Sequence, residues 1–368
     1  MSKNYPKLHE DVCFKRSGGK VIWQPRIDCW IQDRLFEHGD LPGIYKGMSK
    51  LDLYNELGCS ARLYEFNGCF RCVYDESFRT FSSWEGDIIT FFMETPLGTV
   101  TRQERKTPNS WARLVIKEWI VTEEDMKIYT YIEEHTNWEF DQEYFDRVYA
   151  QWGHLGAPTA FLPRVSVQRL YIDLMGVQET IYALEDYPET VEAYFAALRE
   201  CHLRLIDVVC KSPIHIINFG DNLHCGTLSP ELLKKYVLPE YKLRCEKLHA
   251  AGKFVNAHFD GDNKAYLPYY QQTGLDGIEA ITPIPQGDVT LEEVKEAMGD
   301  MVLLDGIPAV YFDETYPEEV LVDCVHKLLD LFAPNLILGI SDEMSSMGNI
   351  ERIRLVGKIV DEYNAQFD

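Results

Sequence analysis

Residues 253–258 read KFVNAH, a short apolar run with the length of one buried β-strand. Similar runs recur in the C-terminal part of the chain, at Ile214–Phe219, Gly277–Ile281, Met301–Leu304 and Leu336–Ile340. Amphipathic helical patterns separate these runs, so strand and helix alternate strictly. This alternation is typical of parallel strands joined by crossover helices.

The helices between these runs carry recognisable start and stop signals. Ser229-Pro230 offers an N-cap followed by proline at the first helical position, and Gly252 stops that pattern. Thr290 and Glu293 form a capping box for a helix that ends at Gly299. Further helical patterns are expected after Pro317 and from about residue 349.

Three strand candidates lie upstream, at Val21–Pro25, Ser60–Tyr64 and Thr159–Leu162. Together with the five later runs they make eight, the number of strands that closes a (β/α)8 barrel. We therefore expect an α/β protein in which residues 1–368 form a single TIM-barrel domain.

The segment from about residue 66 to 156 is too long for one strand–helix unit of such a barrel. It contains a hairpin-like stretch, Ile88–Arg105, with turn residues Pro96 and Gly98, and an acidic, aromatic helical stretch, Glu123–Tyr149. We interpret this segment as an insertion in the N-terminal half that covers one face of the barrel.

Composition excludes several classes of protein. The apolar share is 46%, as a packed globular protein needs, and the net charge of −23 argues against binding nucleic acid or anionic lipid. The polar N-terminus does not look like a secretory signal, and no apolar run approaches the length of a membrane span. The sequence predicts a cytoplasmic protein, and its charge is compatible with a homodimer.

The ten cysteines are scattered and include one CxxC pair, Cys69 and Cys72. Because no second pair lies at a suitable spacing, we expect reduced thiols, which suits a reducing or anaerobic cytosol.

Polar side chains gather where the strands of the expected barrel end, the usual place for chemistry in this fold. These residues are Arg26, Asp28, Arg164, Asp221, His224, His258, Asp260, Glu279, Asp305, Asp342 and Glu343. For Asp28, Arg164 and Asp305, a helix cap or a simple ion pair is at least as good an explanation as chemistry.

His258, Asp260, Glu279 and Asp342 are different, because four acceptors from three strands would repel one another without a cation among them. One imidazole with several carboxylates suits Zn²⁺ or a harder divalent ion. We therefore expect a metal at these four residues.

Three segments resemble the uroporphyrinogen decarboxylase superfamily. They are Asn218–Asp221 with Ser229-Pro230-Glu231, then Ala257–Gly261, and finally Gly339–Asp342 with Asn349–Ile353. The resemblance covers most of residues 155–368 and implies a (β/α)8 barrel. The second segment is similar to the His-x-Cys-Gly segment of the corrinoid-dependent methyltransferase branch.

The resemblance implies one of two chemistries. Decarboxylases of this superfamily bind a polycarboxylate with an arginine-rich segment after the first strand. Here Gln24–Trp30 keeps one arginine, Arg26, and is otherwise acidic and apolar. Since each substrate carboxylate needs a cationic partner, the decarboxylase interpretation is weakened.

The methyltransferase branch implies one zinc per chain. Carried over by position, His258 matches the imidazole ligand, Asp260 takes the place of the first cysteine, Glu279 lies close to the glutamate, and Asp342 aligns with the late cysteine. Carboxylates thus replace both thiolates, which makes the metal a stronger Lewis acid for an oxygen-bearing substrate. Whether Asp260, Asp342 or Glu343 completes the site stays open.

The function that this resemblance implies is transfer of a methyl group from a methyl ether, such as a methoxylated aromatic compound, to a Co(I) corrinoid. No Asp-x-His-x-x-Gly cobalamin motif is present, so a separate corrinoid protein is the expected partner. Asp221 is the predicted proton donor to the leaving oxygen and Glu279 the second catalytic residue. Arg26, Asp28, Arg164 and His224 are expected to bind the substrate.

Two alternatives stay open. One is a metal-independent decarboxylase of a smaller acid, with Arg26 and Arg164 as anchors. The other is a non-catalytic barrel that binds a corrinoid protein or a tetrapyrrole.

Overall fold

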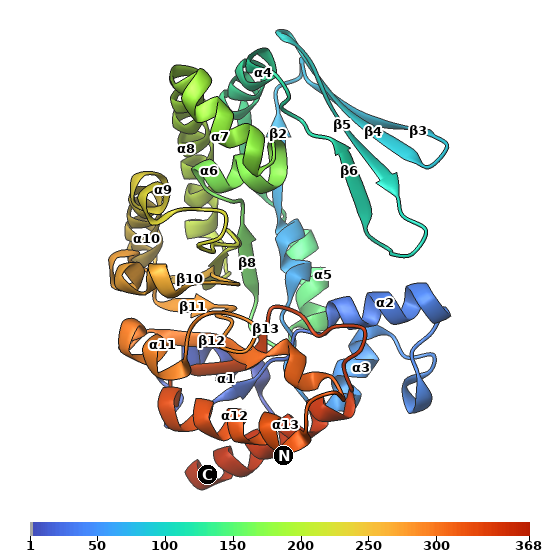
Figure 1. Cartoon of the computed structure of the whole chain (residues 1–368), viewed down its shortest axis with the longest axis vertical. Coiled ribbons are helices and arrows are strands. Elements are labelled where there is room, and N and C mark those ends of the chain that lie inside the picture. The colour runs from blue at the N-terminus through green and yellow to red at the C-terminus, as the bar shows by residue number, and fades with distance from the viewer. Residues whose placement is uncertain (1–2) are drawn as a thin grey trace.

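The computed structural model describes residues 3–368. Its central element is a parallel sheet with strand order β1-β13-β12-β11-β10-β9-β8, curled into an open barrel (Figure 1). The strands are β1 (Ile22–Trp23), β8 (Thr159–Leu162), β9 (Ile216–Phe219), β10 (Phe254–His258), β11 (Gly277–Glu279), β12 (Val302–Pro308) and β13 (Leu336–Ser341). This arrangement confirms the predicted TIM-barrel-like α/β fold.

Helices cover the outside of the curled sheet (Figure 1). Those after β8 are α6 (Ser166–Gln168), α7 (Val177–Asp186), α8 (Pro188–Lys211), α9 (Pro230–Leu232), α10 (Leu238–Ala250), α11 (Leu291–Met298), α12 (Glu318–Phe332) and α13 (Glu351–Asn364). Before the insertion lie α1 (Tyr5–Cys13), α2 (Asp28–His38) and α3 (Lys50–Leu57). None of the helices in the described residues is long and apolar enough to cross a membrane.

The predicted helix boundaries are confirmed. Ser229 accepts a hydrogen bond from the Leu232 backbone N–H, as an N-cap does. Thr290 and Glu293 form the expected capping box of α11, and Gly299 ends that helix.

The prediction of a strand at Ser60–Tyr64 is wrong. Residues 60–63 lie between β1 and the start of β8 without a regular ladder, and a 3₁₀ helix begins at Tyr64. The Ser60 N–H bonds to the Trp23 carbonyl and the Ala61 N–H to the Leu155 carbonyl, while the Gln24 side-chain amide donates to the Ala61 carbonyl at 3.0 Å. Because these backbone groups find partners in β1, in the loop before β8 and in a side chain, the eighth place of the barrel is filled without an eighth strand.

The expected insertion carries more strand than its sequence suggested. It contains β2 (Phe70–Tyr74), β3 (Arg79–Glu85), β4 (Ile88–Thr95), β5 (Gly98–Lys106), β6 (Arg113–Lys117), α4 (Glu123–Glu134), β7 (Thr136–Phe140) and α5 (Gln142–Trp152). The predicted hairpin is confirmed as β4–β5. The predicted helix over Glu123–Tyr149 is wrong in its middle, because β7 pairs with β2 there.

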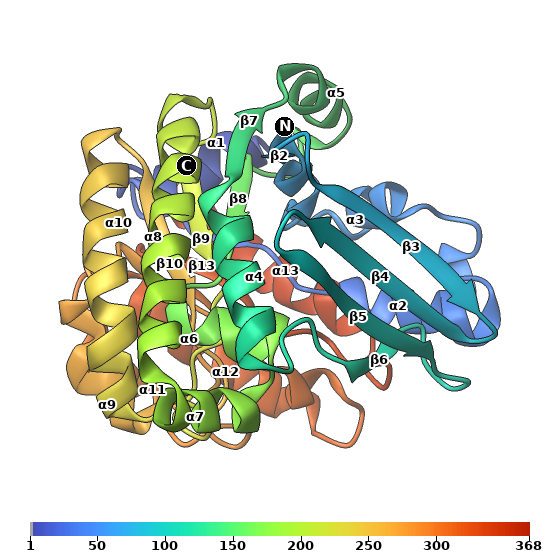
Figure 2. The same ribbon diagram turned by 90° about the horizontal axis from the view of Figure 1, so that it is seen from above.

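The four strands β3 to β6 form an antiparallel sheet that stands beside the barrel strands (Figures 1 and 2). Its β5–β6 connection reaches α2, where Trp111 Nε1 donates to Asp33 Oδ1 at 2.9 Å. Buried residues of this sheet and of α4, such as Met93, Val100 and Met126, belong to the same continuous apolar core as the barrel strands.

A glycine on β13 makes room for a buried carboxylate inside the barrel. A methyl group on Gly339 would overlap Asp305 Oδ1 and would lie 3.0 Å from the Gln24 carbonyl oxygen. Asp305 cannot easily move, since Arg62 Nη2 donates to that oxygen at 2.8 Å.

We therefore expect Gly339→Ala to lower the free energy of unfolding by about 1–3 kcal/mol, the usual cost of overpacking a core. Urea unfolding of the purified protein measures this change. Gly220→Ala is the matched control, because a methyl group there meets no heavy atom within 4 Å. Equal stability of the two variants would contradict the assigned role of Gly339.

Candidate metal centre

The carboxyl ends of neighbouring strands bring the predicted residues to one mouth of the barrel. His258 ends β10 and Glu279 ends β11, and the two are paired in the parallel register. Asp260 follows β10 by two residues, Asp305 lies in β12, and Asp342 directly follows β13. This edge is where catalytic groups lie in barrels of this type.

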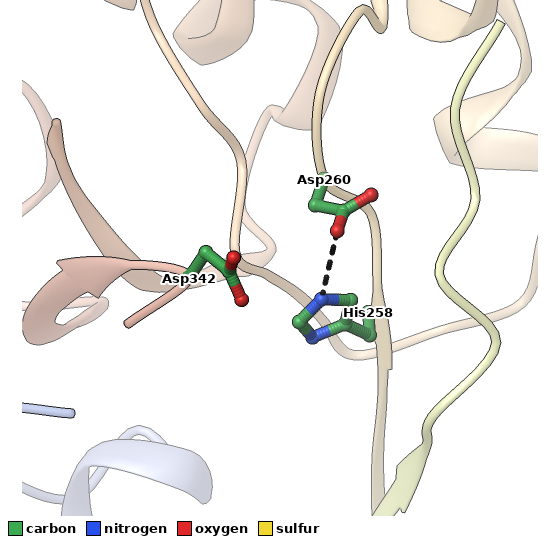
Figure 3. A group of neighbouring side chains, drawn as sticks. All are labelled: His258, Asp260 and Asp342. Atoms are coloured by element: carbon green, nitrogen blue, oxygen red, sulfur yellow. Dashed lines mark ion pairs between the residues drawn. The ribbon is translucent and has the colours of Figure 1, made fainter. Parts of the chain in front are cut away.

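His258, Asp260 and Asp342 form a group that fits a metal ion (Figure 3). One ligand atom from each residue lies within 4.8 Å of the other two. His258 Nε2 faces Asp260 Oδ2 at 3.5 Å. Three protein ligands with room for a fourth is the usual arrangement of a catalytic zinc site.

An observation on His258 itself supports this fit. The side chain is 6% exposed, and its Nε2 atom is buried without a hydrogen-bond partner among the described residues. Its other ring nitrogen, Nδ1, is 3.0 Å from Glu279 Oε2. A metal-binding histidine normally has one nitrogen on the metal and the other on a carboxylate, so the ring is oriented as a ligand would be.

Glu279 lies outside the group of three. Its carboxylate is bound by Arg62 Nη1, by Asn218 Nδ2 at 2.7 Å and by His258 Nδ1. Burial alone would raise the pKa of Glu279, but the Arg62 guanidinium and His258 hold it well below its usual value. The structure thus ties this predicted ligand to an arginine, and its contacts are those of a residue that orients His258.

Asp305 shares the same arginine. Arg62 Nη1 and Nη2 lie 3.1 and 2.8 Å from its two oxygens. Burial raises the pKa of Asp305 more than Arg62 lowers it. The ion-pair explanation considered for Asp305 therefore matches its contacts.

Arg26 lies between this buried pair and the mouth of the barrel. Its guanidinium is 4.0 Å from Asp305, 3.7 Å from Asp342 and 3.3 Å from Glu343. Glu343 also accepts from the Cys29 backbone N–H, so its carboxylate is engaged away from the group of three. Arg26 Nη1 is buried and has no hydrogen-bond partner in the described chain.

The remaining predicted substrate residues are held by local partners. Asp28 forms an ion pair with Lys50 at 2.8 Å. Arg164 pairs with Asp173 at 2.9 Å and donates to Asn222. His224 is closer to the metal group, since its Cβ would lie 3.4 Å from a methyl group on Gly261, next to Asp260.

Asp221, the predicted proton donor, is completely buried. One carboxylate oxygen accepts from the Val165 N–H at 2.7 Å and the other from the Tyr241 hydroxyl. Burial raises its pKa. Through these contacts Asp221, which follows β9, holds the loop after β8 and helix α10 in place. This favours a structural role for Asp221.

Backbone strain is concentrated at this mouth. Asn222, Ala280, Asp305 and Asp342 all have positive φ angles, between 52° and 80°. Such conformations are costly for residues other than glycine and are enriched at functional sites.

Sequence reasoning missed Arg62. It lies in the run Ser60-Ala61-Arg62-Leu63, whose composition predicts a strand. An arginine in such a run, 4% exposed in the structure, was the available signal, because a buried guanidinium requires carboxylate partners.

Comparison with known proteins agrees with this architecture. Residues 169–358 match the family model described as uroporphyrinogen decarboxylase (URO-D). The match spans more than half of the 368 residues. The chain belongs to the uroporphyrinogen decarboxylase family, and it matches no curated protein.

Among solved structures, the fold is similar to that of a methyltransferase from Methanosarcina mazei. The TM-score is 0.58 at 11% identity, over 97% of this chain and 98% of that one. At this identity the likeness shows the fold alone. A B12-independent methionine synthase from a Shewanella species matches with a TM-score of 0.39 at 11% identity, over 95% of this chain and 98% of that one, too low to carry an argument.

The protonation of His258 gives a test of this geometry in the metal-free protein. Burial alone would lower the pKa of His258, but Asp260 and Glu279 raise it from 6.5 to about 9. A raised pKa in the folded state stabilises the protein fully below pH 6.5, and this contribution is lost as the pH rises to 9.

We expect chelator-treated protein to lose up to about 3 kcal/mol of this contribution between pH 6.5 and 9. The measurement is urea unfolding across this pH range for the natural protein and for His258→Gln. The difference between their stabilities should shrink as the pH rises. A difference that does not vary with pH would show that His258 is not held between two carboxylates.

Proposed function

We propose that this protein is a zinc-dependent methyltransferase that moves a methyl group from an O-methyl donor, such as a methoxylated aromatic compound, to the Co(I) corrinoid of a separate protein. The observation that carries the proposal is the convergence of His258 Nε2, Asp260 and Asp342 at the mouth of the barrel. Family membership and the fold shared with a methyltransferase are consistent with it.

Charge supports a divalent cation at this place. Two guanidinium groups, Arg26 and Arg62, lie among five carboxylates: Asp260, Glu279, Asp305, Asp342 and Glu343. Arg62 binds Glu279 and Asp305. Arg26 lies closer to Glu343, at 3.3 Å, than to Asp342, at 3.7 Å. Negative charge in excess of these two arginines is therefore left toward Asp260 and Asp342. A cation held by these two residues and by neutral His258 would reduce that excess.

The chemistry needed from the zinc is Lewis acidity toward the oxygen that departs as the methyl group leaves it. The chain's own residues prepare the site. Glu279, fixed by Arg62 and Asn218, accepts a hydrogen bond from the Nδ1–H of His258 and so keeps Nε2 free for the metal. We assign contact with the donor to His224, whose Cβ would lie 3.4 Å from a methyl group on Gly261, the residue after Asp260.

The methyl group would leave without its bonding electron pair, which would stay on the departing oxygen. The Co(I) corrinoid of the partner protein would supply the electrons of the new bond. Carboxylate ligands favour an oxygen-bearing donor over a thiol, because thiolate ligands would make zinc a softer and weaker Lewis acid.

A second candidate function is decarboxylation of a small acid without a metal. The observation that favours it is the buried, unpartnered Nη1 of Arg26 beside the same mouth. This donor could bind a substrate carboxylate.

The first test is metal binding. We expect about one zinc per chain in protein purified without chelators, measured by elemental analysis, because the three ligand atoms are already gathered. His258→Ala and Asp260→Ala should each weaken zinc binding by at least about 100-fold in a competition with a chromogenic chelator.

The matched control is Asp262→Asn, a change at an exposed acidic residue two positions from Asp260, which should keep its zinc. Full zinc occupancy in His258→Ala would contradict this metal site.

The second test is the reaction itself. Zinc-loaded protein should methylate Co(I) cobalamin when supplied with a panel of methoxyarenes, followed by the absorbance change of the cobalt. The rate should fall by at least about 100-fold in His258→Ala.

Release of CO₂ from small carboxylic acids, unaffected by chelation and lost in Arg26→Gln, would instead establish the second candidate. If the protein shows neither activity but still binds a corrinoid protein, the barrel is a binding module.

A further inference from the structure

The exposed edge of the antiparallel sheet is a surface that the proposed function does not use. Strand β3 (Arg79–Glu85) pairs only with β4 and lies at the outer edge of the sheet in both views (Figures 1 and 2). All seven of its residues are exposed. We propose that a second copy of this chain pairs along this edge, antiparallel to it, to form a symmetric dimer.

The edge lacks the features that normally prevent strand pairing. Residues 80–84 read TFSSW, with no proline and no charge. Natural proteins usually protect edge strands with such residues or with bulges. The opposite edge, β6, differs in this respect, because its pairing with β5 is irregular at Gln103/Glu104.

Alternate residues of β3 direct their backbone hydrogen-bonding groups away from β4, as this pairing requires. Lys106 N–H donates to the Asp87 carbonyl at 2.9 Å, so Asp87 directs its backbone toward β5. The next residue, Ile88, therefore directs its backbone toward β3, where it pairs with Glu85. By the same alternation, Thr80, Ser82 and Trp84 direct their N–H and C=O groups outward.

The charges of β3 favour a second copy of this chain as the partner that pairs with this edge. In an antiparallel pair with Ser82 opposite Ser82, Arg79 of each copy lies opposite Glu85 of the other. Arg79 and Glu85 then form non-hydrogen-bonded pairs just beyond the outermost hydrogen-bonded pairs. In pairs of this kind the opposite Cα atoms are about 4.5 Å apart. Two ion pairs therefore close the two ends of the shared ladder, a self-complementarity that a symmetric interface requires.

The same register joins the exposed aromatic residues. Phe81 is 48% exposed and stacks on Phe92 of β4 at a centroid distance of 4.7 Å. In the dimer, Phe81 of each copy lies opposite Ser83, so the two Phe81 rings are diagonal neighbours across the axis and cover one another. The dimer thereby removes from water an apolar surface that the single chain leaves exposed.

The experiment is sedimentation equilibrium of the full chain at micromolar concentration. The expected mass of the natural protein is twice the 42.6 kDa of the chain. Arg79→Glu and Glu85→Arg should each weaken the dimer by at least about tenfold, because each change turns two attractions into repulsions. The double variant Arg79→Glu/Glu85→Arg should restore the dimer, since the opposed charges are again complementary.

Ser82→Pro gives an independent test. Its N–H points away from β4, so proline there keeps the hairpin but removes a central bond of the proposed ladder. The expected result is a 42.6 kDa species. The control is Lys358→Glu, at an exposed residue of α13, which should stay dimeric, and circular dichroism verifies that each variant is folded.

A natural protein of single-chain mass would overturn the proposal. So would a dimer that the charge reversals leave unchanged or that the double variant does not restore, because either result would place the interface elsewhere. If Ser82→Pro does not fold, the charge-exchange series still decides the question.

Discussion

The buried guanidinium of Arg62 is the interaction on which the centre of this barrel depends. It spans from the segment that replaces the eighth strand to β11 and β12, where it binds Glu279 and Asp305. Two carboxylates at essentially zero exposure would be strongly destabilising without a cation between them. The same contact therefore closes the open side of the sheet and permits acidic residues inside it. Gly339 belongs to this arrangement, since only a residue without a side chain leaves room for Asp305.

Because Arg62 binds both deep carboxylates, the acidic residues of the mouth divide into two layers with different contacts. Glu279 and Asp305 form the deep layer and are bound to protein cations. Asp260 and Asp342 form the outer layer, where Asp342 is 61% exposed and can meet an ion that arrives from solvent. His258 connects the layers, with Nδ1 on Glu279 and Nε2 toward Asp260. Removing a proton from His258 would leave the ring oriented by the deep layer and available to the outer one.

The sequence predicted the barrel well because its strands are continuous apolar runs and its helices have caps, which are local signals. It predicted the convergence of His258, Asp260 and Asp342 for a related reason: the carboxyl ends of parallel strands meet at one edge. The sequence did not predict those features that depend on partners far away along the chain. Ser60–Leu63 has the composition of a strand, but the Gln24 side chain binds the Ala61 carbonyl, and the Ser60 and Ala61 N–H groups bind the carbonyls of Trp23 and Leu155. Likewise, the acidity of Glu279 is visible in the sequence, whereas its partner Arg62, 217 positions away, is not.

The two layers also explain why carboxylates can stand where related methyltransferases are expected to carry thiolates. Asp260 and Asp342 follow the strand ends, where solvent and Arg26 reduce the cost of their charge. Thiolates at these positions would carry the same charge, so the replacement changes the hardness of the ligand atoms. A metal site with carboxylate ligands accepts harder cations than a site with thiolate ligands. It also leaves the bound ion more electron-poor. In the proposed function, negative charge develops on the departing oxygen, so replacing the thiolates that the resemblance implies by carboxylates is compatible with that proposal.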